Sequence, residues 1–269
     1  MTPPVSGPLG RIKAVLFDMD GLLIDSEGIY TKVVNEVLAP YGKEQTWEIK
    51  SRIMGTPERR ATEILLSALW PDADDASKIG KDCPFTIENF LEGRNASLEV
   101  EFAKVQPLPG AVRLVAHLAK HNVPICVATG SKRKNFDLKS AHNHALFAPF
   151  RGRVICGDDP RLQRGKPTPD VFLLAAREGL QEPSIAKEIR LWGAENDAAG
   201  LTGGEGEILV FEDAKPGVQA GKAAGMKVVW VPDPNLRALL SKENEDLKAD
   251  QILESLEDFE PEAWGLPPF

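Results

Sequence analysis

The sequence has few cysteines, no excess of basic residues and no long apolar run. Its 269 residues include three cysteines without a CxxC spacing, which argues against a disulfide framework and a paired-cysteine metal site. No window approaches the ~20 consecutive apolar residues that cross a bilayer. The first ten residues hold three prolines and lack the apolar stretch of a signal peptide. We therefore expect a cytoplasmic protein that binds no membrane.

The charge balance excludes another class of partner. There are 40 acidic and 32 basic residues, so the net charge is −8. Nucleic-acid-binding proteins need a basic face, and we therefore expect no nucleic-acid partner. Most of the excess negative charge lies in residues 26–104 and in the tail from Asp233, so it does not exclude a small anionic substrate elsewhere. With 42% apolar residues the chain can bury a sizeable core, and we expect a monomer.

Short apolar runs alternate with helical patterns along most of the chain. The runs are Ile12–Phe17, Val123–Ala128, Val154–Cys156, Ile208–Phe211 and Val228–Val231. The helical patterns between them are Ala111–Lys120, Lys134–Leu146, Pro169–Gly179 and Pro216–Gly225. Continuously apolar runs are typical of strands buried on both faces of a parallel sheet, and the alternation predicts an α/β fold. Residues 182–206, which are rich in glycine, predict a surface loop.

One long stretch contains only helical patterns. Residues 26–104 include the patterns Thr31–Leu38 and Ala61–Trp70 but no convincing strand. Both ends of this stretch return to the same place in the α/β alternation. We therefore expect a Rossmann-like parallel-sheet core formed by residues 1–25 and 105–269, with an all-helical cap domain inserted at residues 26–104.

Acidic side chains follow two of the expected strands. Asp18 and Asp20 come after the first strand, and Glu212 and Asp213 come at the end of the fourth. In open α/β sheets, ligands bind beyond the carboxyl ends of the strands. Carboxylates this close repel one another unless a cation neutralises them, and Mg²⁺ prefers oxygen ligands. Each aspartate alone could simply cap a helix or a turn, but four converging acids favour a magnesium site.

Other strand ends supply groups that suit a phosphoryl oxygen. Thr129 and Gly130 follow the second strand, and Lys166 lies between the third strand and the next helix. Lysine provides a compact positive charge, and a glycine turn lets backbone N–H groups approach closely. A surface lysine and a plain turn are the alternatives for each motif alone. Their common place at one sheet edge favours a phosphate-binding site.

Four motifs occur in a fixed order, namely DMDGLLIDSE, VATGS, GKPTPDVF and VFEDAKPGVQAGKAAGM. Together they resemble the four signature motifs of the haloacid dehalogenase-like phosphatases, and the resemblance runs from about Ile12 to the C-terminus. Within that superfamily the chain is most similar to the pseudouridine-5'-phosphatase group. The further segments that carry this similarity are MGT at 54–56, GDDP at 157–160, AGMKVVWVPD and DFEPEAWGLP.

The resemblance implies Mg²⁺-dependent hydrolysis of a small phosphorylated metabolite through an aspartyl-phosphate. On the matching motifs, Asp18 would be the nucleophile and Asp20 the general acid and base. Because Asp20 must be protonated for the first step, we expect neighbouring carboxylates or cap closure to raise its pKa. The implied metal ligands are Asp18, the Asp20 backbone carbonyl, Asp213 and, through a water, Glu212. The implied phosphate-binding residues are Thr129, Gly130 and Lys166.

The identity of the substrate depends on the cap. Arg52 and Arg59 lie beside Met54 and Gly55, where related enzymes place residues that contact the substrate, and we expect one of these arginines to face it. Pseudouridine 5'-phosphate is the leading candidate. Sugar phosphates, glycerol phosphate and flavin mononucleotide (FMN) are alternatives for the same chemistry.

Two other functions compete with that of a phosphatase. Phosphomutases similar to beta-phosphoglucomutase have a cap histidine a few residues after the pair equivalent to Asp25 and Ser26, and no histidine follows here up to Tyr30. A phosphatase is therefore favoured over a mutase. A non-catalytic sensor of phosphorylated metabolites is the second alternative, and the complete set of motif residues argues against it.

Overall fold

The computed structural model describes residues 11–181, 205–239 and 247–269. Its core is a parallel sheet with the strand order β3-β2-β1-β4-β5-β6. The strands are β1 (Ala14–Phe17), β2 (Ile125–Ala128), β3 (Val154–Ile155), β4 (Ile208–Glu212), β5 (Lys227–Trp230) and β6 (Gln251–Ile252). The predicted parallel α/β core is confirmed. Strand β6 was not predicted because two residues give no readable pattern, and the predicted loop at 182–206 falls almost entirely outside the described residues.

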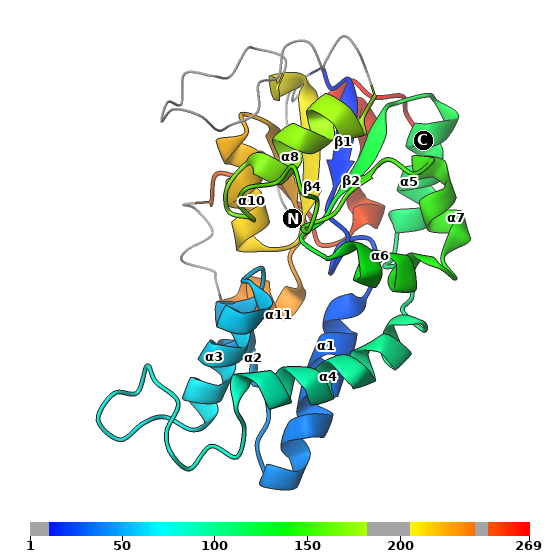
Figure 1. The fold of residues 1–269 in the computed structure, drawn as a ribbon. Helices are drawn as coiled ribbons and strands as arrows, with labels where there is room; N and C mark the ends of the chain where they lie inside the picture. The colour runs from blue at the N-terminus through cyan, green and yellow to red at the C-terminus, as the bar shows by residue number, and fades with distance from the viewer. Residues whose placement is uncertain (1–10, 182–204, 240–246) are drawn as a thin grey trace.

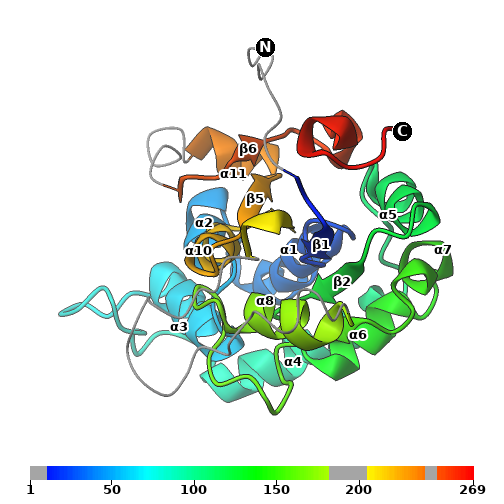
Figure 2. The same cartoon turned by 90° about the horizontal axis from the view of Figure 1, so that it is seen from above.

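Both faces of the sheet are buried. Along β1, Val15 and Phe17 pack into one apolar cluster, whereas Ala14 and Leu16 pack into another. Helix α5 (Ala111–Lys120) covers the first face, and helices α8 (Asp170–Leu174) and α10 (Lys215–Ala223) cover the second (Figure 2). This two-sided burial explains why the strand sequences are apolar throughout rather than alternating.

The helix predicted over Lys134–Leu146 is divided in two. Helix α6 (Arg133–Ser140) ends before α7 (His144–Phe147), which continues into a short 3-10 turn, η2 (Ala148–Phe150). At the break, the Asn143 side chain donates hydrogen bonds to the carbonyl oxygens of Lys139 and Val105, each at 3.0 Å. Asparagine side chains compete with the helical backbone for such partners, which accounts for the interruption.

The segment between β1 and α5 forms the helical cap, a separate lobe below the core in Figure 1. Its helices are α1 (Ser26–Leu38), α2 (Trp47–Ile53), α3 (Glu58–Leu69) and α4 (Ile87–Phe102), with a 3-10 turn, η1 (Ala39–Tyr41). The side chain of Asp25 caps α1 by accepting a hydrogen bond of 3.2 Å from the Gly28 N–H. The predicted all-helical cap is therefore confirmed, while its limits at 26 and 104 stay a prediction.

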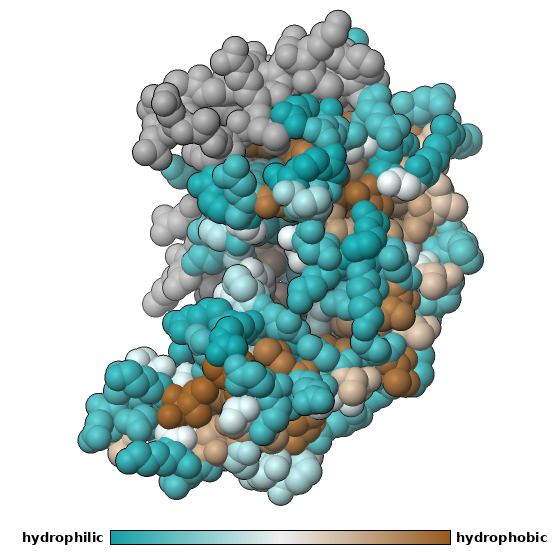
Figure 3. Space-filling model, in the orientation of Figure 1, coloured by the Kyte–Doolittle hydropathy of each residue, from teal (hydrophilic) through white to brown (hydrophobic). Residues whose placement is uncertain are grey.

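The C-terminal segment packs back onto the sheet. Helix α11 (Pro234–Leu239) contacts cap helix α2, and the 3-10 turns η7 (Leu256–Asp258) and η8 (Pro261–Trp264) follow β6. The Trp264 side chain is fully buried, and the backbone carbonyl oxygen of this residue accepts a hydrogen bond of 3.0 Å from the Ile12 N–H. In the view of Figure 3, hydrophilic residues cover much of the core, and hydrophobic residues show on the cap and beside its boundary with the core. None of the helices in the described ranges has the length and apolar character needed to span a membrane.

Candidate active site

The central feature of the site is a group of three buried carboxylates. Because Phe17 of β1 pairs with Phe211 of β4, the residues that follow these two come together at the carboxyl edge of the sheet. The ligand oxygens of Asp18, Glu212 and Asp213 all lie within 4.8 Å of one another. The sheet register thus brings together acids that are almost 200 positions apart in the sequence.

Lys166 is a buried cation that contacts this cluster. Its Nζ donates hydrogen bonds to Asp18, to Glu212 Oε1 at 2.6 Å and to the Ala128 carbonyl at 3.2 Å. Burial by itself would lower the pKa of Lys166, but the two carboxylates outweigh this effect and raise it. The lysine therefore stays charged and offsets part of the negative charge around it.

The charge on the cluster is still not balanced. Burial raises the pKa of Asp18 to about 7 despite the attraction of Lys166. Burial and the repulsion of Glu212 and Asp18 also raise the pKa of Asp213, whose carboxylate accepts no hydrogen bond from the described residues. Three oxygen donors with uncompensated negative charge form a set that fits a hard divalent cation such as Mg²⁺.

Two glycines leave room for these acids. Gly21 has a φ of +75°, and a Cβ there would collide with the Asp213 carboxylate. A Cβ on Gly217, in the first turns of α10, would overlap the carboxylate of Glu212. Glu212 Oε2 instead accepts hydrogen bonds from the backbone N–H groups of Asp213 and Ala214, at 3.1 and 3.2 Å. The carboxylates therefore leave no space for a side chain at these positions, which explains the glycines in the first and fourth motifs.

Asp20 has different surroundings from the other acids. Its carboxylate accepts hydrogen bonds from Ser26 Oγ at 2.5 Å, Ser131 Oγ at 2.6 Å and Lys139 Nζ at 2.5 Å. Burial would raise its pKa, but the charge of Lys139 and the hydrogen bonds from these three side chains lower it. The expected raised pKa of Asp20 is therefore wrong for this state of the protein, because a buried cation was not foreseen.

Sequence reasoning missed Lys139. This residue belongs to α6, and its side chain is fully buried. Its position three residues after Phe136, which is also buried, places both side chains on the inward face of the helix. That spacing was the available signal, but most helical lysines lie on the surface, so the pattern alone did not single it out.

The predicted phosphate-binding residues lie at the same edge of the sheet. Thr129 is buried at the end of β2, and its Oγ1 accepts a hydrogen bond of 3.0 Å from the Ser131 N–H, which forms a tight turn around Gly130. Lys166 reaches this turn through its bond to the Ala128 carbonyl. The structure therefore brings the three groups together, while their contacts to a phosphoryl group stay a prediction.

The two cap arginines are not brought to the cluster by any contact among the described residues. Arg52 is exposed, and the 62% exposed side chain of Arg59 pairs with Glu88 at 2.6 Å. Their predicted role in substrate binding therefore gains no support from the geometry. A different cap cation, Lys50, is buried and lies 3.3 Å from a carboxylate oxygen of Glu27.

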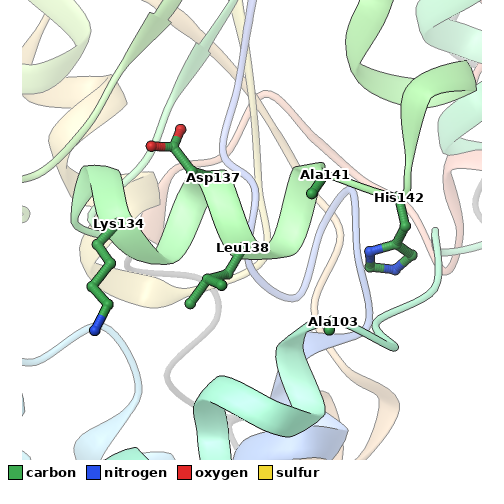
Figure 4. A pocket seen from close by; sticks show the side chains of 6 residues that line it. All are labelled: Ala103, Lys134, Asp137, Leu138, Ala141 and His142. Atoms are coloured by element: carbon green, nitrogen blue, oxygen red, sulfur yellow. The ribbon is translucent and has the colours of Figure 1, made fainter.

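Two hollows lie near the boundary between core and cap. One, of about 210 Å³, is lined from the core by Gly21 and Asp213 and from the cap by Glu27, Trp47 and Met54, among others. The other, of about 480 Å³, lies beside α6 (Figure 4) and is lined by Ala103, Lys134, Asp137, Leu138, Ala141 and His142. The first hollow adjoins the carboxylate cluster, whereas the second contains none of the predicted site residues.

Comparisons with known proteins agree with this geometry. Residues 12–225 match the model of the haloacid dehalogenase-like hydrolases. The chain is 39% identical to (DL)-glycerol-3-phosphatase 2 of Arabidopsis thaliana, over 98% of this chain and 96% of that protein. It is 34% identical to a probable pseudouridine-5'-phosphatase of Drosophila melanogaster, over 97% of each chain.

A solved structure is similar over the same extent. The chain superposes on a HAD family hydrolase of Deinococcus radiodurans R1, crystallised with phosphate and sodium, with a TM-score of 0.68 and 25% identity. The match covers 97% of this chain and 100% of that one. The predicted family and the predicted enzyme class, a phosphatase, are thus confirmed, and this chain belongs to the haloacid dehalogenase-like hydrolase family.

Proposed function

We propose that the protein is a Mg²⁺-dependent phosphomonoesterase that hydrolyses a small phosphorylated metabolite through an aspartyl-phosphate. The observation that carries this proposal is the cluster of Asp18, Glu212 and Asp213, whose ligand oxygens lie within 4.8 Å of one another. Lys166 lies against two of these acids. The phosphatase relatives support the same chemistry.

The three carboxylates are the residues that would hold Mg²⁺, together with the Asp20 backbone carbonyl implied by the family motifs. The fit rests on the chemistry of the donors, which are oxygens, buried and short of positive charge. When bound, the ion would neutralise negative charge on the phosphoryl group and on the cluster, so that a carboxylate can approach an anionic phosphate.

The reaction would proceed in two steps. In the first, an Asp18 carboxylate oxygen attacks phosphorus, the bond from phosphorus to the leaving oxygen breaks, and Asp20 gives that oxygen a proton. In the second, water attacks phosphorus and gives a proton to Asp20. The bond from phosphorus to the Asp18 oxygen breaks, so inorganic phosphate is released and the Asp18 carboxylate is restored. Lys166 and the turn at Thr129 and Gly130 would hold the phosphoryl oxygens and offset their charge.

The hydrogen bonds at Asp20 favour its charged form. Three donors keep it as a carboxylate in this state of the protein, which is the form that accepts a proton from water. The proton for the first step must therefore arrive with the bound substrate, or after closure of the cap has changed these contacts.

Two alkyl phosphates are the leading substrate candidates. Pseudouridine 5'-phosphate is the candidate from the sequence motifs and is supported by the Drosophila relative. Glycerol 3-phosphate is supported by the higher identity to the Arabidopsis enzyme. The hollow of about 210 Å³ that adjoins the carboxylate cluster is lined by the polar side chains of Glu27 and Asp213 and by the aromatic side chain of Trp47. A lining of this kind suits a hydroxylated leaving group.

A panel of phosphomonoesters tests the proposal. It contains both candidates, FMN, several sugar phosphates and 4-nitrophenyl phosphate, and kcat/KM is measured with Mg²⁺ and with EDTA. We expect hydrolysis only with Mg²⁺ and the highest kcat/KM for one of the two candidates. Interconversion of sugar phosphates without release of phosphate would instead indicate a mutase, and binding without turnover of any member would indicate a sensor.

Metal binding should stabilise the protein in a pH-dependent way. Asp18 and Asp213 ionise near pH 3.8 when unfolded, but their pKa values are raised in the metal-free folded state, to about 7 for Asp18. The folded state then binds more protons than the unfolded state at pH values between the unfolded and folded pKa of each group. The contribution of Asp18 to stability is therefore present below pH 3.8 and is lost as pH rises through about 7, and that of Asp213 is lost in the same direction. A bound cation favours the ionised carboxylates and removes this loss.

Saturating Mg²⁺ should therefore raise the melting temperature more at about pH 8 than at about pH 5. At 100 times Kd the gain is about 2.7 kcal/mol, or roughly 5–10 °C. Differential scanning fluorimetry with Mg²⁺ and with EDTA measures it, and Asp213→Asn should reduce the gain. An equal Mg²⁺ effect at both pH values, or in the wild type and Asp213→Asn, would contradict the assignment.

A further inference from the structure

Lys139 lies where the cap meets the carboxyl edge of the sheet. Its Nζ is 2.5 Å from Asp20 Oδ1 and 3.2 Å from Ser131 Oγ. From the cap, Tyr30 Oη lies at 3.3 Å, and the centre of the Phe102 ring lies at 4.2 Å. A fully buried ammonium group is costly unless it is compensated, and these contacts compensate it in this state of the protein.

These contacts fix both oxygens of the Asp20 carboxylate. Oδ1 accepts hydrogen bonds from Lys139 and Ser26, and Oδ2 accepts one from Ser131. The three donors come from α6, from the start of cap helix α1 and from the loop after β2. A carboxylate bound on both oxygens from three elements has a fixed plane, and lysine is the one charged donor among the three.

We propose that Lys139 is a positioning residue that orients the Asp20 carboxylate for proton transfer and links its orientation to the cap through Tyr30 and Phe102. This inference rests on the proposed function, in which Asp20 exchanges a proton with the leaving oxygen and then with water. Lys139 acts through Asp20, because its ammonium group is enclosed by Asp20, Ser131 and the two aromatic rings.

The dependence of kcat/KM on the leaving group tests this role. An alkoxide needs a proton as its bond to phosphorus breaks, and a positioned acid contributes about 10²–10⁴-fold to such a step. A 4-nitrophenolate ion leaves without one. Lys139→Met should therefore lower kcat/KM for the better of the two alkyl candidates about 10- to 100-fold more than for 4-nitrophenyl phosphate.

The ratio of the two kcat/KM values is the measured quantity. Both substrates are assayed on the same preparation, so the ratio does not depend on how much of the variant is folded. Lys134→Met is the matched control, because Lys134 belongs to the same helix (Figure 4) and is exposed. Its side chain pairs with Glu99 of α4. This control should leave the ratio unchanged.

A double-mutant cycle tests whether Lys139 acts through Asp20. Asp20→Asn should lower the ratio on its own, and adding Lys139→Met to that variant should not lower it further. Equal losses on both substrates in Lys139→Met, or a further fall of the ratio in the double variant, would overturn the inference. If Asp20→Asn leaves the ratio unchanged, the acid role in the proposed function fails and the inference falls with it. If Asp20→Asn lowers the ratio and Lys139→Met does not, only the inference falls.

Discussion

Asp18→Asn should lower kcat by at least about 10⁴-fold on every phosphomonoester that the protein hydrolyses. The amide cannot attack phosphorus, so the two-step route is closed for all leaving groups alike. The fold should survive, because burial raises the pKa of Asp18 to about 7 and an uncharged side chain is well tolerated there. Steady-state assays with 4-nitrophenyl phosphate and a melting curve in EDTA measure both effects.

A matched control separates the role of Asp18 from a general effect of charge. Asp82→Asn removes one negative charge from an exposed position of the cap and should leave both kcat and the melting temperature unchanged. More than a tenth of the wild-type kcat in a folded Asp18→Asn variant would rule out Asp18 as the nucleophile. Loss of turnover together with retained substrate binding would confirm that the chemical step was removed.

Lys166→Met should reduce both activity and stability. The variant loses the buried cation that faces Asp18 and Glu212, and removing one partner of a buried ion pair costs about 3–5 kcal/mol. The loss of its charge from the phosphoryl site should lower kcat/KM by about 10²–10³-fold. Chemical denaturation in EDTA and steady-state kinetics with Mg²⁺ measure the two effects.

Mg²⁺ should stabilise the Lys166→Met variant more than the wild type, because the ion then faces carboxylates that have lost their other counter-charge. Lys120→Met, at an exposed position of α5, is the control and should change neither stability nor activity. A Lys166→Met variant as stable in EDTA as the wild type would show that the ion pair does not hold the cluster together. Unchanged kcat/KM would contradict the phosphate-binding role.

Most of the fold could be read from the sequence because both sheet faces are covered. A strand such as Ala14–Phe17 must then be apolar at every position, and five runs of this kind were visible. The carboxyl ends of parallel strands share one edge, so Asp18 and Asp213 could be placed together before the structure was known. The two-residue strand β6 and the break between α6 and α7 were missed, since each depends on contacts with distant residues.

The buried cations could not be predicted in the same way. Lys139 and Lys50 are lysines in helical segments, and lysines in helices lie on the surface in most proteins. Lys139 is buried because cap helices pack against the core and bring Tyr30 and Phe102 over it, whereas Lys50 is buried by packing between cap helices α1 and α2, which places Glu27 beside it. The same packing reversed the expected direction of the pKa shift at Asp20.

The sequence by itself determined the α/β core, the inserted helical cap, the family and the four strand-end motifs, because each of these is a local pattern or an ordered series of them. The tertiary structure decided the electrostatic state of each motif residue. Lys166 pairs with Asp18 and Glu212, and Lys139 pairs with Asp20. The Asp213 carboxylate accepts no hydrogen bond from the described residues. A pKa depends on burial and on charges a few ångströms away, and those distances are set by the packing of segments far apart in the chain.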